Sequence, residues 1–70
     1  MQSLPNIEKS TLRRGEYVGY ANGVWRITKS NSSFGSWAAR HLTDFRAPLL
    51  FAFRLKDMSE KLQEYERTQP

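Results

Sequence analysis

The chain offers few side chains that could carry out covalent or metal chemistry. It has one histidine, His41, with a carboxylate three residues later at Asp44, and it contains no cysteine. A nucleophilic relay needs a serine or cysteine held beside its base, and no serine is marked for that role. A zinc site needs three or four ligands, usually imidazole or thiolate. We therefore expect that the protein is not an enzyme and has no catalytic residue, no metal or other cofactor and no small-molecule substrate. His41 is expected to be a half-buried or surface residue.

Recognition of an anionic partner is the chemistry that the composition favours. The net charge is +4. Residues 1–54, with eight bases and three acids, have a net charge of +5, whereas residues 55–70 have a net charge of −1. Basic domains attract polyanions, above all nucleic acid. Guanidinium groups bind phosphates and guanine edges, and aromatic rings stack on bases. The candidate binding residues are Tyr17, Arg26, Thr28, Lys29, Arg40 and Arg46. The alternative is that these residues are ordinary solvent-exposed side chains that only keep the protein in solution.

A β-hairpin around Asn22-Gly23 is the element expected to position most of these residues. This dipeptide between alternating runs is typical of a type I′ turn, because both central residues of that turn need a positive φ. A two-residue loop would place Tyr20 opposite Trp25, Val18 opposite Ile27 and Glu16 opposite Lys29 on the core face. The solvent face would then carry Tyr17 with Thr28, Gly19 with Arg26, and Ala21 with Val24.

The rest of the chain predicts one or two more strands and a helix. In a third strand, residues 36–41, Trp37 would point inward and Arg40 outward, and the apolar run 49–53 favours a further short strand. Leu55, Met58, Leu62 and Tyr65 recur at helical spacing, and opposite charges at i, i+4 pair Lys56 with Glu60 and Asp57 with Lys61. We expect an α+β fold, with an antiparallel sheet of three to four strands and one C-terminal helix packed on one face.

Domain organisation and location follow from length and composition. Seventy residues predict a single domain, 1–70, with an N-terminal arm over 1–12, the antiparallel sheet over 15–53 and the helix over 55–66. The longest apolar stretch has seven residues, against about 20 needed to span a bilayer, and no secretory signal is evident. Because cysteine is absent, we expect an intracellular protein, and the short apolar stretch leads us to expect no membrane partner. The phage and mobile-element hypotheses given below make the expected location the cytoplasm of a bacterial host cell.

One segment resembles known DNA-binding domains. Residues 34–40 read Phe-Gly-Ser-Trp-Ala-Ala-Arg, which resembles the W-G-K-W-A-A-E-I-R strand of plant ethylene-response-factor domains. The order of elements is also similar to the N-terminal DNA-binding domain of conjugative-transposon integrases. Both families read the major groove with a three-stranded sheet backed by a helix. The resemblance aligns Phe34 with a tryptophan that lies against the DNA backbone. Arg40 stands where those domains have a glutamate at the interface, and Leu42 stands where they have an arginine that contacts DNA.

These observations lead to three functional hypotheses. The first is a non-catalytic binding protein of a phage or mobile element, which contacts DNA or a nucleic-acid complex through its basic, aromatic sheet face. The second rests on general character alone, because a small, basic, cysteine-free chain that begins at Met1 is similar to anti-CRISPR proteins. It implies an inhibitor that binds a host CRISPR effector complex and blocks access of nucleic acid. The third is a homodimer formed through the sheet faces or residues 49–53.

Overall fold

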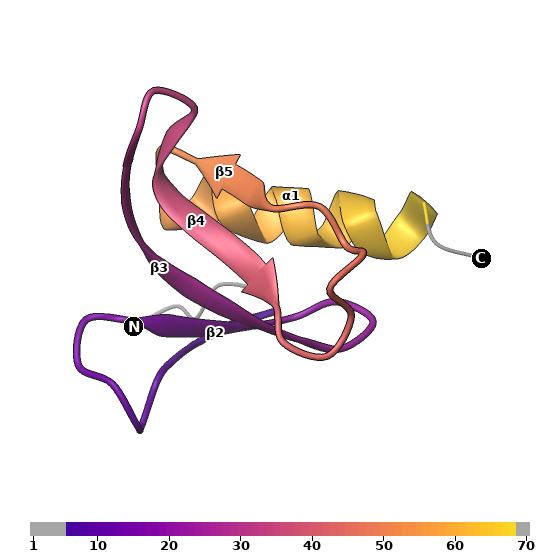
Figure 1. Cartoon of the computed structure of the whole chain (residues 1–70), viewed down its shortest axis with the longest axis horizontal. Helices are drawn as coiled ribbons and strands as arrows, with labels where there is room; N and C mark the ends of the chain where they lie inside the picture. Colours follow the sequence, from indigo (N-terminus) through magenta and orange to yellow (C-terminus); the bar gives the residue numbers. More distant parts are fainter. Residues whose placement is uncertain (1–5, 69–70) are drawn as a thin grey trace.

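An antiparallel sheet of five strands and one C-terminal helix make up the described part of the chain, residues 6–68 of a computed structural model (Figure 1). The elements are β1 (Ile7–Lys9), β2 (Tyr17–Tyr20), β3 (Val24–Ser32), β4 (Gly35–His41), β5 (Leu50–Ala52) and α1 (Leu55–Thr68). The strand order is β1-β2-β3-β4-β5, so each strand pairs with its neighbour in sequence. The predicted α+β class with an antiparallel sheet and a C-terminal helix is confirmed.

The predicted number of three to four strands is wrong, because a strand also forms at the N-terminal edge. β1 lies inside the segment that the sequence predicts as an arm, and it pairs Ile7 with Gly19 and Lys9 with Tyr17. Asn6 precedes it with a φ of 66°, and its carbonyl accepts a hydrogen bond from the Tyr20 N–H at 2.8 Å. A strand of three residues is too short to show an alternating pattern in the sequence. Residues 1–5 of the predicted arm lie outside the described residues.

The predicted register of the first hairpin is wrong by one residue. The structure pairs Tyr17 with Ile27, Val18 with Arg26, Gly19 with Trp25, and Tyr20 with Val24. The loop therefore has three residues, Ala21 to Gly23, in which Asn22 and Gly23 have φ values of 51° and 133°. Because side chains alternate with period two, this shift moves every β2 side chain to the opposite face from the predicted one.

Close packing of the helix on the sheet explains why the observed register is preferred. A Cβ atom at Gly19 would lie 2.6 Å from Cδ1 of Leu62 and 3.2 Å from Cδ1 of Ile27. A side chain at this position would therefore displace the terminal methyl groups of Leu62 and Ile27 in the core. The predicted register would instead bring Val18 and Tyr20 under the helix, where the space is already filled.

The core lies between the sheet and α1, on the face that we call the inner face. Its largest fully buried side chains are Trp25 and Ile27 from β3 and Met58 and Leu62 from α1. The indole N–H of Trp25 donates to the Ala21 carbonyl at 2.9 Å, and its ring meets Tyr65 edge-on at 5.0 Å. The predicted apolar face of the helix is therefore confirmed, and α1 extends two residues beyond the predicted end. The expected ion pairs Lys56–Glu60 and Asp57–Lys61 are not formed within 4.0 Å in the described part of the helix.

The opposite surface, which we call the outer face, is not covered by the helix (Figure 1). The predicted alternation of the third strand is confirmed, since Ala39 and His41 of β4 are buried on the inner face and Arg40 is exposed. Trp37 also points inward, but it is only half-buried. The outer face carries Val18 and Tyr20 from β2, Arg26 and Thr28 from β3, Ala38 and Arg40 from β4, and Phe51 from β5.

Candidate nucleic-acid interface on the outer face

Three of the predicted binding residues lie together at the centre of the outer face. Arg26 and Thr28 are on β3, and Arg40 on β4 is the register partner of Arg26. Directly opposed residues of antiparallel strands hold their Cβ atoms about 4.5–5.5 Å apart. Two arginines are thus presented side by side on the central strands, with the half-buried Thr28 next along β3.

Tyr17, which the sequence places on the same face, lies on the inner face instead. The one-residue register shift pairs it with Ile27 and makes it half-buried. Its ring meets the Trp37 ring edge-on, with 5.5 Å between centroids. Tyr17 therefore packs against the core and is removed from the set of outer-face residues.

Lys29 and Arg46 lie away from the central arginines. Lys29 is paired with Trp37 on the inner side of the sheet, and its Nζ atom lies 5.8 Å from the centroid of the Trp37 ring. Arg46 is exposed in the loop between β4 and β5, where its backbone N–H donates to Oδ1 of Asp44 at 3.0 Å. Neither residue therefore lies beside the paired arginines of the outer face.

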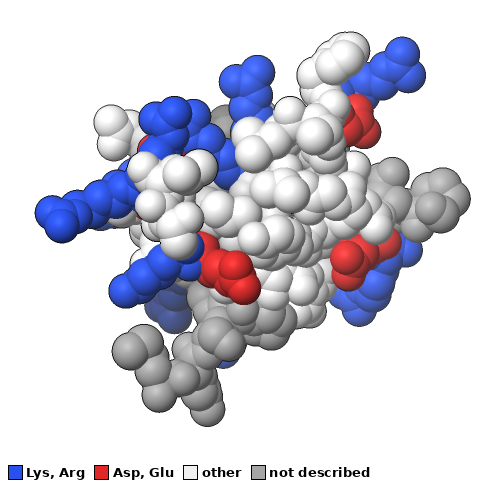
Figure 2. Space-filling model, turned by 90° about the horizontal axis from the view of Figure 1, so that it is seen from below, with Lys and Arg blue, Asp and Glu red and all other residues white. Residues whose placement is uncertain are grey.

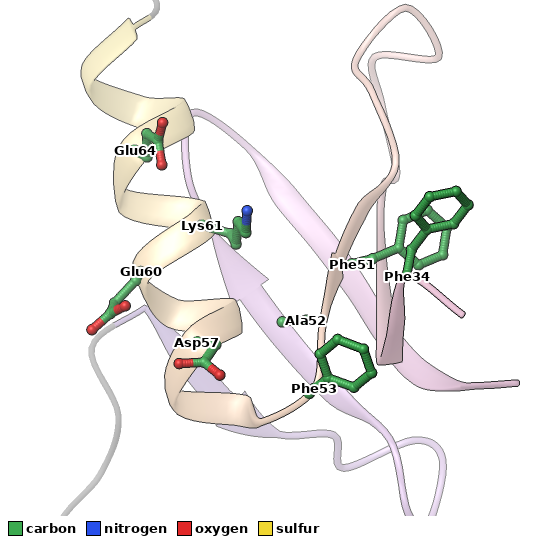
Figure 3. A pocket seen from close by; sticks show the side chains of 8 residues that line it. All are labelled: Phe34, Phe51, Ala52, Phe53, Asp57, Glu60, Lys61 and Glu64. Carbon is green, nitrogen blue, oxygen red and sulfur yellow. The ribbon is translucent and has the colours of Figure 1, made fainter. Parts of the chain in front are cut away.

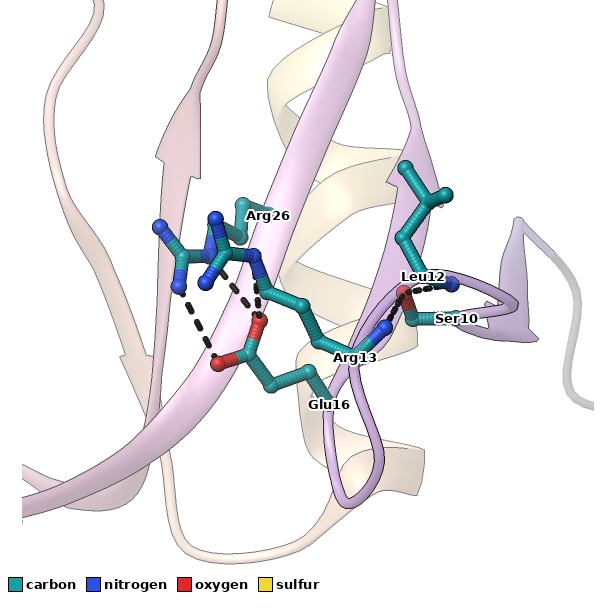
Figure 4. A network of polar contacts seen from close by, with 5 residues as sticks. All are labelled: Ser10, Leu12, Arg13, Glu16 and Arg26. Carbon is teal, nitrogen blue, oxygen red and sulfur yellow. Dashed lines mark hydrogen bonds and ion pairs between the residues drawn. The ribbon is translucent and has the colours of Figure 1, made fainter.

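An ordered loop brings a further arginine, Arg13, to the outer face (Figure 4). The loop of residues 10–16 is closed by the Ser10 N–H, which donates to the Glu16 carbonyl at 3.0 Å. Inside it, the Ser10 hydroxyl oxygen accepts hydrogen bonds from the N–H groups of Leu12 and Arg13 at 3.2 and 3.1 Å. Serine commonly caps turns in this way. Figure 4 shows the Arg13 and Arg26 side chains reaching the same carboxylate, Glu16.

Glu16 holds Arg26 in a two-pronged ion pair. Nε and Nη2 of Arg26 donate to Oε1 and Oε2 of Glu16 at 2.9 and 3.1 Å, and Nε of Arg13 lies 4.0 Å from Oε1. The hydrogen bonds from Arg26 hold the pKa of Glu16 below its ordinary value of 4.5, with the charges of Arg26 and Arg13 acting in the same direction against desolvation. The same hydrogen bonds raise the pKa of the Arg26 guanidinium.

The resulting group, which we call the arginine cluster, consists of Arg13, Arg26, Arg40 and Glu16. Three guanidinium groups and one carboxylate leave it a net charge of +2. The ion pair uses two of the five N–H donors of Arg26, so further donors remain for a ligand. Figure 2 shows Lys and Arg side chains gathered at the left of the molecule, on the side where Figure 1 draws the loop between β1 and β2.

Sequence reasoning missed Arg13 and one exposed aromatic residue, Phe45. Phe45 is 89% exposed in the loop between β4 and β5 and lines a shallow pocket together with Arg40 and Leu49. An aromatic side chain flanked by Asp44 and Arg46 in a polar loop is a signal that could have been used. The position of Arg13 had no such signal, because it depends on the fold of the loop. Phe34, which belongs to the segment that resembles DNA-binding domains, is exposed, and so is Leu42, which replaces an arginine of those domains.

His41 has a structural role and is more buried than expected, with 7% exposure. Its Nδ1 atom accepts hydrogen bonds from the backbone N–H groups of Thr43 and Asp44 at 3.2 and 2.9 Å. The proton must therefore be on Nε2, which donates to the Asn22 carbonyl at 3.0 Å. The imidazole ties the hairpin loop to the end of β4. It also explains Gly23, because a Cβ atom there would overlap the imidazole ring.

Among residues 6–68, no three His, Asp or Glu side chains come together in a way that could hold a metal ion. No described helix is long and apolar enough to cross a membrane. No protein-family model matches the chain, and no curated protein or solved structure shows significant similarity to it.

Proposed function

We propose that this is a non-catalytic binding protein that contacts DNA, alone or within a nucleic-acid complex, through the outer face of its sheet. The observation that carries the proposal is the pairing of Arg26 with Arg40 on the two central strands, beside Arg13 and away from the helix. A ribbon of antiparallel strands fits the major groove of DNA, which is about 12 Å wide. Size and the lack of cysteine support an accessory protein of a phage or mobile element, acting in the cytoplasm of a bacterial host.

Each part of the face has a distinct task in this proposal. The arginine cluster binds phosphates, which supplies affinity that is independent of base sequence. Phe45, next to Arg40, offers an exposed ring that can stack on an unpaired base or pack on a sugar. Glu16 keeps Arg26 from moving freely, so less side-chain entropy is lost when a phosphate binds to Arg26.

The alternative function is an anti-CRISPR-like inhibitor that binds a host CRISPR effector complex and blocks its access to nucleic acid. The observation in its favour is the number of large apolar side chains on the surface. Leu12, Phe34 and Phe45 are all more than 70% exposed. Aromatic residues and arginine dominate the energetics of protein interfaces, so the same surface suits a protein partner as well.

Binding of a fluorescent mixed-sequence DNA duplex, measured by anisotropy at low and moderate salt, tests the first proposal. The test variant combines Arg13→Glu with Arg40→Glu and leaves the Arg26–Glu16 pair in place. We expect its affinity to fall at least about tenfold, because two attractions to phosphate become repulsions. The matched control combines Lys56→Glu with Arg67→Glu, two exposed residues of α1, and has the same net charge.

Two results would contradict the proposal. One is the absence of duplex binding by the native protein at low salt. The other is an equal loss in the test and control variants, which would mean that only total charge matters. Binding to a purified CRISPR effector complex without binding to free DNA would favour the alternative.

A further inference from the structure

A groove follows the free edge of β5 (Figure 3), and none of its lining residues belongs to the arginine cluster. β5 is the last strand in the sheet order, and within the described residues it pairs only with β4. A strand at the edge of a sheet presents N–H and C=O groups that another strand can bind. The groove has a volume of about 400 Å³ and runs between β5 and α1.

One wall of the groove is aromatic. Phe51 points to the outer face, and its ring lies 6.0 Å from that of Phe34, which comes from the turn between β3 and β4. Phe53 follows directly after β5 and also lines the groove, at the level of Asp57 (Figure 3). Phe34 and Phe53 are 73% and 61% exposed, although burying such rings is strongly favourable. This wall is therefore suited to apolar side chains of a partner.

The other wall is acidic. Asp57, Glu60 and Glu64 follow one face of α1, with Lys61 between them, and all four line the groove. Three carboxylates and one ammonium leave this wall a net charge of −2 in a protein whose total is +4. None of the four forms an ion pair within 4.0 Å in the part of the chain that the structure describes. The carboxylates are therefore free to pair with cations of a partner.

We propose that this groove binds an extended, cationic segment of a partner protein, which adds to β5 as a further strand. Backbone hydrogen bonds to an edge strand supply affinity in this mode of recognition, and side-chain contacts supply specificity. Side chains of an added strand alternate between the two faces of the sheet. One set would pack on Phe34 and Phe51, and the other would face Glu60 and its neighbours. The groove therefore selects a segment in which apolar and basic residues alternate.

Charge excludes the other obvious occupants of this edge. If two copies paired through β5 in antiparallel fashion, a two-fold axis would place both helices on the same side of the joined sheet. The two acidic walls would then face each other, −2 against −2, which is unfavourable. Nucleic acid is repelled by the same carboxylates. The inference is independent of the proposed DNA interface, since it uses none of the residues of the arginine cluster.

Two synthetic hexapeptides test the proposal on the whole protein: Lys-Val-Lys-Val-Lys-Val and Lys-Lys-Lys-Val-Val-Val, both with blocked ends. They have the same charge and composition, but only the first alternates. Two-dimensional amide NMR titrations give both the affinity and the location of binding. We expect the alternating peptide to bind at least about tenfold more tightly than the block peptide, with shifts confined to residues 50–64 and to Phe34.

Charge reversal in the groove gives the second measurement. The variant Glu60→Lys with Glu64→Lys should bind the alternating peptide about tenfold more weakly, since two attractions become repulsions. The matched control, Glu8→Lys with Glu66→Lys, carries the same charge change outside the groove and should bind as the native protein does. All four residues are exposed, so both variants are expected to fold. Phe34→Ser, on the exposed turn, should also weaken binding.

Several outcomes would overturn the inference. Equal affinity for the two peptides would show that the acidic wall attracts any cationic peptide and that the peptide does not pair with β5 as a strand. The same conclusion would follow if the control variant lost as much affinity as the groove variant. Amide shifts in residues 50–52 that appear on concentrating the protein alone would assign the edge to a second copy. Shifts of the same amides with duplex DNA would assign it to nucleic acid.

Discussion

Glu16 lies between two arginines, so its ionisation links the loop of residues 10–16 to the central strand that carries Arg26. With 22% of its side chain exposed, it is the least exposed member of the ion pairs, and it accepts both bonds of the Arg26 fork. Paired guanidinium and carboxylate groups of this kind are among the stronger hydrogen-bonded pairs in proteins. At the residue scale, the contact between this loop and β3 therefore depends on a single carboxylate.

Replacing that carboxylate should change the pH dependence of stability. Because the pKa of Glu16 in the folded protein lies below 4.5, its contribution is complete above that value and is lost as the pH falls through the folded pKa. We expect Glu16→Gln to be less stable than the native protein at neutral pH. The difference in unfolding free energy should shrink as the pH is lowered below 4.5 and then disappear. Urea unfolding at a series of pH values measures this difference.

Glu66→Gln serves as the control for that experiment. It removes the same charge from an exposed position of α1, where no ion pair is formed within the described residues. Its difference from the native protein should remain small at every pH. A Glu16→Gln variant whose destabilisation does not change between neutral and acidic pH would contradict the assignment of the ion pair.

At the scale of elements, the observed register of β2 against β3 and the register expected from the sequence predict opposite effects of Gly19→Val on stability. Gly19→Val adds a branched side chain that meets Leu62 and Ile27 under the helix, and overpacking of this kind typically costs about 1–3 kcal/mol. If Gly19 lay on the solvent face, valine would stabilise the strand instead. Thermal unfolding decides the sign. Tyr20→Val, on the outer face of the same strand, should stay within about 0.5 kcal/mol of the native protein.

The same hairpin shows how far the elements could be predicted from the sequence. The position of the turn followed from the Asn22-Gly23 dipeptide. The inward Trp25, the alternation along residues 36–41 and the apolar face of the helix followed from periodicity. The register did not, because a two-residue and a three-residue loop around Asn22-Gly23 both leave Trp25 and Ile27 on one face. What separates them is the close approach of Leu62 to Gly19, a contact between residues 43 positions apart in the sequence. Local pattern carries no information about such a contact.

The candidate site was predictable to the same extent. Arg26, Thr28 and Arg40 were placed on one face because they belong to β3 and β4, whose alternation is clear. Tyr17 was misplaced together with the register of β2. Arg13 was missed because it lies in a loop, where the position of a side chain depends on particular hydrogen bonds and not on a repeating pattern. Phe45 was missed although its place in a polar loop was a signal for an exposed aromatic side chain.

At the scale of the whole molecule, charge is divided between two separate surfaces. The arginine cluster carries +2 on the outer face, and the groove beside β5 carries −2.

If DNA binds mainly through three arginines, the logarithm of the association constant should fall with the logarithm of salt concentration with a slope of about −2.7. Anisotropy titrations over a tenfold range of salt measure this slope. The Arg13→Glu, Arg40→Glu variant should have a slope much closer to zero.

A slope steeper than about −5 would mean that the DNA contact is larger than the arginine cluster. Arg46, in the loop that carries Phe45, is the residue that a wider contact of the outer face would include first, whereas Lys29 lies on the inner side of the sheet. Because the two charged surfaces are separate, saturating the groove with the alternating lysine and valine peptide should leave the salt slope for DNA unchanged.

The order of the five strands has a consequence for how the chain folds. Each strand pairs with the one that follows it in sequence, so the whole sheet is a series of hairpins and requires no long crossover. Pairs that are close in sequence lose little entropy when they form, and folding rates rise as the mean sequence separation of native contacts falls. The sheet can therefore form by successive hairpin closure, which is fast for a β-rich protein. Contacts such as Leu62 with Gly19 must wait until α1 docks.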